Sequence, residues 1–165
     1  NFIARLLPRW NNHVMSTDES MPSVTLRPVD LRNWQQVIHL RLSQEQATRV
    51  ASNLYSLAEA YVQPSCTPYA IYANETLIGF AMAEYLAAPQ AYNIPRFMID
   101  IAWQGVGYGS LALQAIIDTL KEERPEAPIL ISLTPDNAAA RGLYERHGFV
   151  DTGQRFHGED VLRYP

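Results

Sequence analysis

The sequence predicts a single mixed α/β domain. Segments that alternate apolar and polar residues are interspersed with segments that repeat apolar residues at helical spacing. One unit runs from a strand through a glycine-rich turn and a helix into a second, buried strand, which predicts a parallel pair. The 165 residues, 47% apolar and 18% charged, can bury a core without disulfides or metals. We assign residues 22–165 to this domain and no function to the extension 1–21.

Composition and charge exclude several classes of protein. A net charge of −4 gives no electrostatic basis for binding nucleic acid, and no apolar run reaches the ~18 residues of a membrane span. The one cysteine, Cys66, excludes an internal disulfide and suits a cytoplasmic protein. Prolines flank it and no histidine is near in sequence, so a nucleophilic role is disfavoured.

The first third of the chain predicts a strand followed by helices. Residues 24–28 alternate and end at a proline, which predicts the first strand. Residues 33–36 have the Asn-x-x-Gln form of a capping box, and a helix of two to three turns is expected after it. The segment 44–62 is helical in two pieces, and a second capping pattern occupies residues 56–59.

The middle of the chain predicts a hairpin and then a single strand. Residues 69–73 and 76–85 are rich in strand formers, with Asn74 in the short turn between them. A further strand, 94–101, leads into the glycine-rich turn.

The last third alternates helices with strands. The segment 107–122 repeats apolar residues along one helical face, and 129–133 is a short apolar run expected to lie parallel to the strand before that helix. Residues 137–147 predict a helix closed by a glycine, and 149–156 and 160–164 predict two final strands.

The turn 104–110 is glycine-dense and opens a helix, so its backbone N–H groups suit a phosphate or pyrophosphate. A nucleotide P-loop would require Gly-Lys-Ser/Thr at the helix start, which is absent. A dinucleotide fingerprint is met only in part, because Ser110 follows Gly105 and Gly107 and too few strands remain.

The remaining interpretation is coenzyme A. Gln104-x-x-Gly107-x-Gly109 resembles the (Gln/Arg)-x-x-Gly-x-(Gly/Ala) motif of the GNAT family of N-acetyltransferases, and 134–149 resembles that family's Asn-x-x-Ala, Leu-Tyr and Gly-Phe signature. The resemblance implies a mostly antiparallel sheet of about six to seven strands, a splayed parallel pair and about four flanking helices. It also implies acetyl-CoA as co-substrate, no metal, and a chain able to form a homodimer.

The resemblance assigns residues to the coenzyme. They are Phe97, Ile99, Gln104, Gly105, Val106, Gly107, Tyr108, Gly109, Ser110, Asn137 and Tyr144. Asn137 would contact the pantetheine arm, but it is also a good helix N-cap. Tyr144 matches the family's tyrosine near the thioester sulfur, where a phenol can donate a proton; the alternative is that it only packs beside Leu143. His147 is better explained as a helix-end residue than as a catalyst.

The base that deprotonates the acceptor amine is less well defined. Some family members carry a carboxylate where this chain has Pro95 and Arg96, so we expect Glu84 on the neighbouring strand to take the proton, with Asp100 a weaker candidate. The alternative for Glu84 is an edge-strand carboxylate that faces solvent.

Parts of the chain resemble the bacterial diamine and polyamine acetyltransferase branch of the family. These stretches are 50–61, 96–100 and 158–163. The resemblance implies that Asn53, Glu59 and Glu84 line the acceptor pocket, where carboxylates attract a polycation; Glu59 has the competing interpretation of a capping-box residue.

We therefore expect an enzyme that moves an acetyl group from acetyl-CoA to a small diamine or polyamine by direct attack in a ternary complex. The alternatives are transfer to a protein, peptide or other amine, and a non-catalytic acyl-CoA-binding module.

Overall fold

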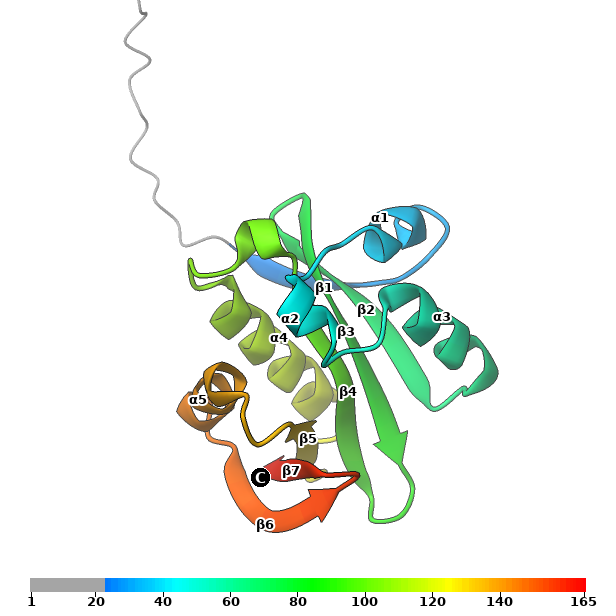
Figure 1. Cartoon of the computed structure of the whole chain (residues 1–165). Helices are drawn as coiled ribbons and strands as arrows, with labels where there is room; N and C mark the ends of the chain where they lie inside the picture. Colours follow the sequence, from blue (N-terminus) through cyan, green and yellow to red (C-terminus); the bar gives the residue numbers. More distant parts are fainter. Residues whose placement is uncertain (1–22) are drawn as a thin grey trace, which may run out of the picture.

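The computed structural model describes residues 23–165, and the segment 1–21 to which we assign no function lies outside this range. The described residues form one seven-stranded sheet in the order β1-β2-β3-β4-β5-β7-β6 (Figure 1). The strands are β1 (Val24–Pro28), β2 (Cys66–Ala73), β3 (Thr76–Leu86), β4 (Ala91–Ile99), β5 (Ile129–Leu133), β6 (Val150–Phe156) and β7 (Glu159–Tyr164).

Helices connect the strands. In the described part of the chain they are α1 (Trp34–Ile38), α2 (Gln44–Ala47), α3 (Asn53–Val62), the 3-10 helix η1 (Ile101–Trp103), α4 (Tyr108–Glu123) and α5 (Ala138–Arg146). The predicted mixed α/β fold with a mostly antiparallel sheet is confirmed, with one α-helix more than the four expected.

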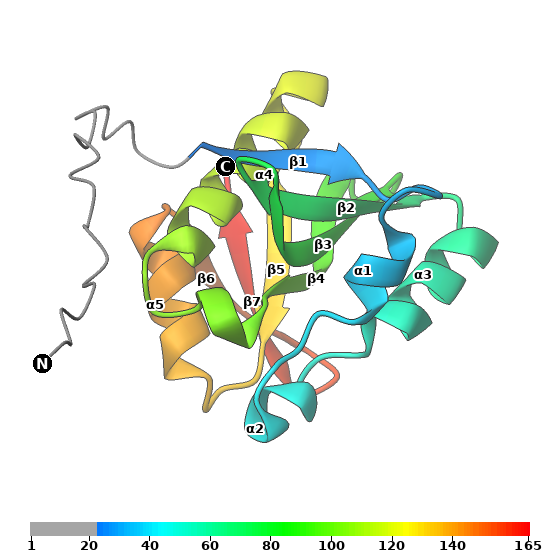
Figure 2. The same cartoon turned by 90° about the horizontal axis from the view of Figure 1, so that it is seen from above.

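The helices cover both faces of the sheet (Figure 2). On one face α1 and α3 pack Val37 and Leu57 against a core that includes Phe80 and Met82. On the other face α4 supplies its apolar side chains, such as Ile116, to a larger core that also includes Tyr144 of α5 and Phe149. Because both faces are covered, the inner strands β3 and β4 are apolar on both sides.

The parallel pair of the sheet separates soon after it forms. β4 and β5 pair only at Tyr92 with Ile129 and at Asn93 with Leu130. Beyond these residues β4 continues to pair with β3, whereas β5 pairs with β7. The segment 94–99 of β4 therefore has a backbone edge that faces β5 without pairing to it, as the splay implied by the family resemblance requires.

The first capping box predicted from sequence is wrong. α1 has five residues rather than two to three turns, and Asn33 at its N-cap makes no capping hydrogen bond. The Asn33 side chain instead accepts a hydrogen bond from the Asp30 backbone N–H at 2.9 Å, so it stabilises the turn before the helix.

The second capping box is also wrong. α3 begins earlier than the pattern predicted, and its cap is Ser52, whose hydroxyl accepts from the Tyr55 N–H. Ser56 lies inside the helix and donates to the Ser52 carbonyl at 3.1 Å. Glu59 therefore does not cap this helix. A complete capping box does form at residues 43–46, at the start of α2.

Candidate active site

A cleft of about 1160 Å³ opens where β4 and β5 separate. Its walls come from β4, β5, α5, the glycine-rich turn, the α2 to α3 segment and the β6–β7 turn. Of the residues assigned to the coenzyme from sequence, seven line it: Phe97, Ile99, Gln104, Gly105, Gly109, Asn137 and Tyr144. The other four, Val106, Gly107, Tyr108 and Ser110, belong to the same turn but do not line the cleft.

The glycine-rich turn presents unpaired donors at the N-terminus of α4. Gly105 and Gly107 have φ values of +79° and +97°, a left-handed conformation that L side chains rarely adopt. Among the described residues, no backbone or side-chain acceptor takes a hydrogen bond from the N–H groups of 105–109. A 16-residue helix starting here adds its dipole, so the turn can bind an anion such as a pyrophosphate.

Gln104 holds this turn in place. Its side-chain amide donates to the Ile99 carbonyl at 2.8 Å, and it exchanges hydrogen bonds with the Gln46 side chain at 3.0 and 3.1 Å. These contacts tie the turn to the end of β4 and to α2. The side chain of Gln104 thus acts on the site mainly through the position of the backbone beside it.

The free edge of β4 lies in the cleft at Phe97 and Ile99, where the sequence predicted pairing with an extended ligand. The Ile99 carbonyl already accepts the bond from Gln104, although a carbonyl oxygen has a second lone pair. The edge at Phe97 has no such internal partner among the described residues.

Asn137 caps helix α5 and also lines the cleft. Its side-chain oxygen accepts from the Ala140 N–H at 3.2 Å, which caps α5. The same residue lines the cleft, and its side-chain NH₂ has no acceptor within residues 23–165, so it remains free to donate to a ligand. Because the cap uses only the oxygen, the two functions are compatible.

Tyr144 lines the cleft with its ring largely buried at 7% exposure, packed 5.9 Å from the Phe149 ring centroid. Its hydroxyl makes no hydrogen bond with any described residue. Burial raises the pKa of Tyr144 to about 12, and the nearby negative charge of Glu159 adds to the effect. The phenol therefore keeps its proton well above neutral pH and can act as a donor in the cleft.

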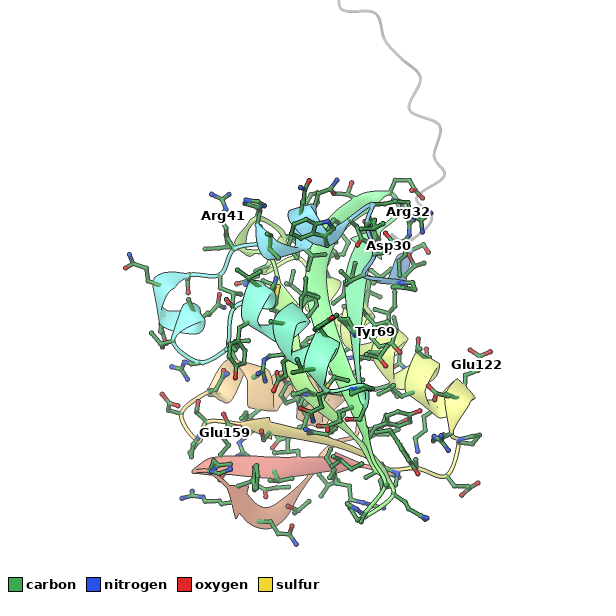
Figure 3. The ribbon with its side chains drawn as sticks, turned by 90° about the vertical axis from the view of Figure 1, so that its right-hand side faces the viewer. Asp30, Arg32, Arg41, Tyr69, Glu122 and Glu159 are labelled. Carbon is green, nitrogen blue, oxygen red and sulfur yellow. The ribbon has the colours of Figure 1, made fainter. Side chains whose placement is uncertain are left out.

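Glu159 is the cleft residue that sequence reasoning missed. It begins β7, lines the cleft and is half-buried, and the Ser132 hydroxyl of β5 donates to its carboxylate (Figure 3). The other cleft carboxylates, Glu45 and Asp136, both pair with Arg49. Within residues 23–165 Glu159 has no cationic partner. Its alternation with Val161, which also lines the cleft, is the sequence signal that could have identified it.

Arg49 connects two walls of the cleft. Its guanidinium donates to Thr134 and Asp136, both at 3.1 Å, and to Glu45 at 2.8 Å. Thr134 and Asp136 belong to the loop between β5 and α5, whereas Arg49 follows α2. Arg49 thus links segments on opposite sides of the cleft and neutralises the charges of two cleft carboxylates, Glu45 and Asp136.

The three residues predicted to contact the acceptor do not line this cleft. Asn53 is buried at 8% exposure and donates to the Val37 carbonyl at 2.8 Å, so it joins α3 to α1. Glu59 forms an ion pair with Arg96 at 3.0 Å, and it is Arg96 that lines the cleft. Arg96 stands at a position where some family members carry a carboxylate, and its ion pair with Glu59 explains the position of the Glu59 side chain.

Glu84 lies one strand away from the cleft. It is opposite Asn93 in the β3–β4 register, and Asn93 lines the cleft. Its carboxylate accepts from Gln63 at 2.6 Å and from Ser65 at 3.1 Å, and it does not line the cleft that contains Tyr144. Asp100, the weaker candidate, accepts backbone bonds from Arg41 and Ala102. Neither carboxylate is in position to contact an acceptor in the cleft directly.

His147 is the helix-end residue that the sequence predicted. Its Nδ1 donates to the Leu143 carbonyl at 2.9 Å, so its Nε2 accepts from the Ser110 hydroxyl at 3.0 Å. The imidazole thereby connects the end of α5 to the start of α4. Both ring nitrogens are used in this link, which leaves neither for catalysis.

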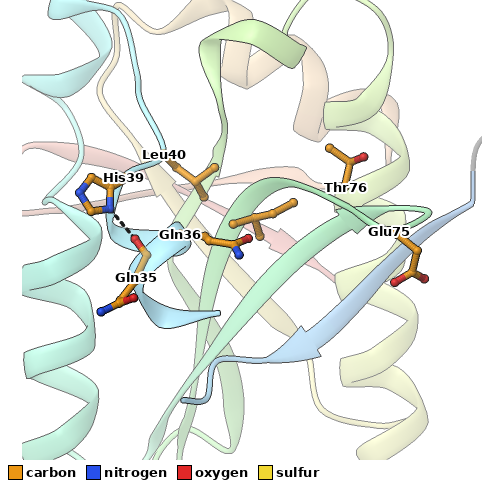
Figure 4. Close-up of a pocket in the computed structure, with 7 residues that line it drawn as sticks. Gln35, Gln36, His39, Leu40, Glu75 and Thr76 are labelled. Atoms are coloured by element: carbon orange, nitrogen blue, oxygen red, sulfur yellow. Dashed lines mark hydrogen bonds between the residues drawn. The ribbon is translucent and has the colours of Figure 1, made fainter. Parts of the chain in front are cut away.

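A second hollow of about 640 Å³ lies between α1 and the β2–β3 turn (Figure 4). The His39 ring donates to the Gln35 carbonyl at 2.5 Å, and Glu75 on the opposite wall pairs with Arg27. No group of three or more His, Cys, Asp or Glu residues suited to a metal occurs in the described residues. None of the described helices is both long enough and apolar enough to span a membrane.

Comparison with known proteins gives matches over most of the chain. The model of the acetyltransferase (GNAT) family matches residues 30–149. The chain is 31% identical over 147 residues to the spermine/spermidine N(1)-acetyltransferase of Bacillus subtilis strain 168, a match that covers 85% of this chain and 97% of that relative.

Solved structures share the fold. An aminoglycoside acetyltransferase in complex with coenzyme A matches with a TM-score of 0.70 at 22% identity, over 86% of this chain and 92% of the other. A spermidine N-acetyltransferase from Vibrio cholerae, in complex with coenzyme A and spermine, matches with a TM-score of 0.68 at 20% identity, over 86% and 93%. At these identities the structural matches establish the fold.

Proposed function

The chain belongs to the acetyltransferase (GNAT) family, and we propose that it acetylates a primary amine of a small diamine or polyamine with acetyl-CoA as the donor. The observation that carries the proposal is the carboxylate of Glu159, which has no cationic partner among residues 23–165, in the same cleft as the protonated phenol of Tyr144 and beside the turn 105–109, whose N–H groups have no acceptor in that range. The carboxylate suits a cationic acceptor, the phenol suits a thiolate leaving group, and the N–H groups suit a pyrophosphate.

Acetyl-CoA fits the donor end of the cleft. The N–H groups of 105–109 would bind its pyrophosphate, because left-handed glycines at 105 and 107 keep side chains away from the donors. The free edge at Phe97 and the NH₂ of Asn137 would bind the amides of the pantetheine arm. When bound, acetyl-CoA supplies the acetyl group as a thioester.

Tyr144 would act as the general acid. With a pKa of about 12 its phenol is protonated at neutral pH, so the O–H can donate to the sulfur as the carbon–sulfur bond breaks. The amine attacks the same carbonyl carbon and loses a proton, so one proton enters the thiol and one leaves the new amide. Orientation of both substrates between β4 and β5 contributes much of the rate.

Glu159 would bind the acceptor's charge. A half-buried carboxylate without a cationic partner favours an ammonium ion, and Ser132 already fixes its direction. The sequence assigned acceptor binding to Asn53, Glu59 and Glu84, but Glu159 is the better candidate because it lines the cleft with Tyr144. Glu84 would act only indirectly, through Asn93 or a water molecule.

The relatives support a polyamine acceptor. The Bacillus subtilis relative is named for spermine and spermidine, and the match spans 97% of its length. The Vibrio cholerae structure with a similar fold is a spermidine N-acetyltransferase bound to coenzyme A and spermine. Direct attack in a ternary complex fits a single cleft that holds both the donor site and Glu159.

We predict that Glu159→Gln raises the KM for spermidine by about tenfold or more, because the substitution removes one charge-assisted hydrogen bond, about 1.5–3 kcal/mol. The Kd for coenzyme A should stay the same. Steady-state kinetics and calorimetry measure the two quantities. Glu122→Gln, an exposed site on α4 far from the cleft, is the matched control (Figure 3). An unchanged KM in Glu159→Gln would exclude Glu159 from acceptor binding.

The experiment that tests the function is an acceptor panel. Purified protein and acetyl-CoA are incubated separately with putrescine, spermidine, spermine, an aminoglycoside and a lysine peptide, and release of free thiol is followed. We expect the polyamines to give the highest kcat/KM. Thiol release with the peptide alone would favour a protein acceptor instead.

A further inference from the structure

The end strand β6 forms part of the cleft wall but has little apolar packing of its own. It lies at the edge of the sheet and pairs only with β7. Six of its seven residues are exposed, including Phe156 at 64%. Gln154 and Phe156 nevertheless line the cleft, next to Glu159 and Val161 of β7. Because apolar burial does not fix this wall, polar contacts have to hold it.

β6 also contains a β-bulge. The pairs Asp151 with Leu162 and Arg155 with Asp160 leave three residues of β6, but only one of β7, between them. Extra residues of this kind bend a strand and increase its twist, and β6 is curved in Figure 1. The bend therefore determines where the end of the β6–β7 hairpin, residues 150–164, lies over the cleft.

The place of Glu159 depends on this hairpin. Glu159 is one residue beyond the last β5–β7 pair, which is Leu133 with Asp160. Its backbone lies opposite Phe156 of β6, and its carboxylate accepts from the Ser132 hydroxyl. If β6 changed its bend, the start of β7 would move with it, and the carboxylate would lose its direction toward the cleft.

Arg141 of α5 connects the two strand positions that flank the bulge. Its guanidinium donates to Asp151 of β6 at 2.9 Å and to Asp160 of β7 at 2.5 Å. Asp151 also accepts from the N–H of Gly153, inside the bulge, at 2.8 Å. The side chains of Arg141 and Asp160 are only 25% and 14% exposed, so water and salt weaken this pair less than an exposed one. Arg155 pairs with Asp160 as well, but it belongs to the hairpin and does not tie it to α5.

Arg141 also ties the hairpin to the helix that carries Tyr144, three residues further along α5. It thereby links the helix of the proposed general acid to the strand of the carboxylate proposed to bind the acceptor. We propose that Arg141 is a positioning residue: by joining Asp151 to Asp160, it fixes the bend of β6 and holds Glu159 in place for the acceptor amine. This rests on the proposed function, in which Glu159 binds the acceptor's charge.

Steady-state kinetics of Arg141→Met tests the proposal, because methionine keeps an apolar stem and a good helix former but removes both donors. The KM for spermidine should rise by about threefold to tenfold, while kcat changes less than about twofold. Loss of a positive charge near the cleft would by itself favour a polycation and lower KM. A rise in KM would therefore report a displaced Glu159 rather than a change in charge.

Arg146→Met is the matched control, because it removes the same charge from an exposed position on the same helix, and it should not raise KM. In a Glu159→Gln background, Arg141→Met should cause no further rise, since both substitutions act on the same contact. Asp151→Asn weakens the same link from the β6 side and should also raise KM. It provides a second variant outside α5, and circular dichroism checks the folding of each variant.

Hydrogen exchange of the unliganded full chain gives a measurement that requires no activity. Arg141→Met should speed exchange in residues 152–161 and leave the turn 105–109 unchanged. Unchanged exchange in 152–161 would overturn the proposal, as would a KM that stays constant in Arg141→Met or rises equally with and without Glu159→Gln. An unchanged KM in Glu159→Gln, with faster exchange of the hairpin in Arg141→Met, would support the link made by Arg141 and overturn only the acceptor role of Glu159.

Discussion

Replacing Tyr144 with phenylalanine should lower kcat by about 100-fold, in the range typical for loss of a general acid, and leave the Kd for coenzyme A nearly unchanged. The substitution removes only the hydroxyl, which has no hydrogen-bond partner in residues 23–165, so the packing against Phe149 remains. Single-turnover kinetics would measure the chemical step and calorimetry the binding of coenzyme A.

Tyr164→Phe is the matched control, because Tyr164 also packs against Phe149, at 5.5 Å between centroids, but lies outside the cleft lining. The pH profile gives a second check. An acid with a pKa of about 12 holds its proton below that value and loses it above, so Tyr144 should cause no fall in kcat between pH 7 and about pH 10. An unchanged kcat in Tyr144→Phe would remove the residue from the mechanism.

Replacing Gly107 with valine should reduce affinity for coenzyme A by about 100-fold or more. At a φ of +97° valine destabilises the turn by at least about 1–2 kcal/mol. If the backbone relaxes to relieve this strain, the N–H groups of the turn no longer point together at the pyrophosphate of coenzyme A. Gly107 also forms the N-cap of α4, where its carbonyl accepts from Ser110 and Leu111. Calorimetric titration with coenzyme A measures the effect.

Gly153→Val separates this effect from general destabilisation. Gly153 has a φ of +71° in β6, and an added Cβ at either glycine would meet nothing within 4 Å. Both variants should therefore unfold at similarly reduced temperatures, whereas only Gly107→Val should lose coenzyme binding. Equal binding by the two variants would contradict the assignment of the turn to the pyrophosphate.

The elements set by local pattern were predicted well from sequence. The hairpin around Asn74 and the buried strand 129–133 follow from alternation and apolar runs, and both occur. The glycine-rich turn and the Asn137 cap also follow from local chemistry, because φ > 0 and an unpaired helix N-terminus favour specific residue types.

The acceptor side could not be predicted in the same way, because it depends on contacts between distant segments. Ser56 and Glu59 match a capping box locally, yet Arg96, 37 residues from Glu59, takes both side chains. Glu159 meets Ser132 only because β7 pairs with β5. Residues whose roles are set by strand pairing leave little trace in a single sequence.

The most direct test of the proposed function is to identify the product formed from acetyl-CoA and spermidine. Mass spectrometry of the reaction should detect N-acetylspermidine in an amount equal to the free thiol released, and Tyr144→Phe should form it far more slowly. Thiol release without any acetylated polyamine, with spermidine, spermine and putrescine all unchanged, would contradict the proposed acceptor.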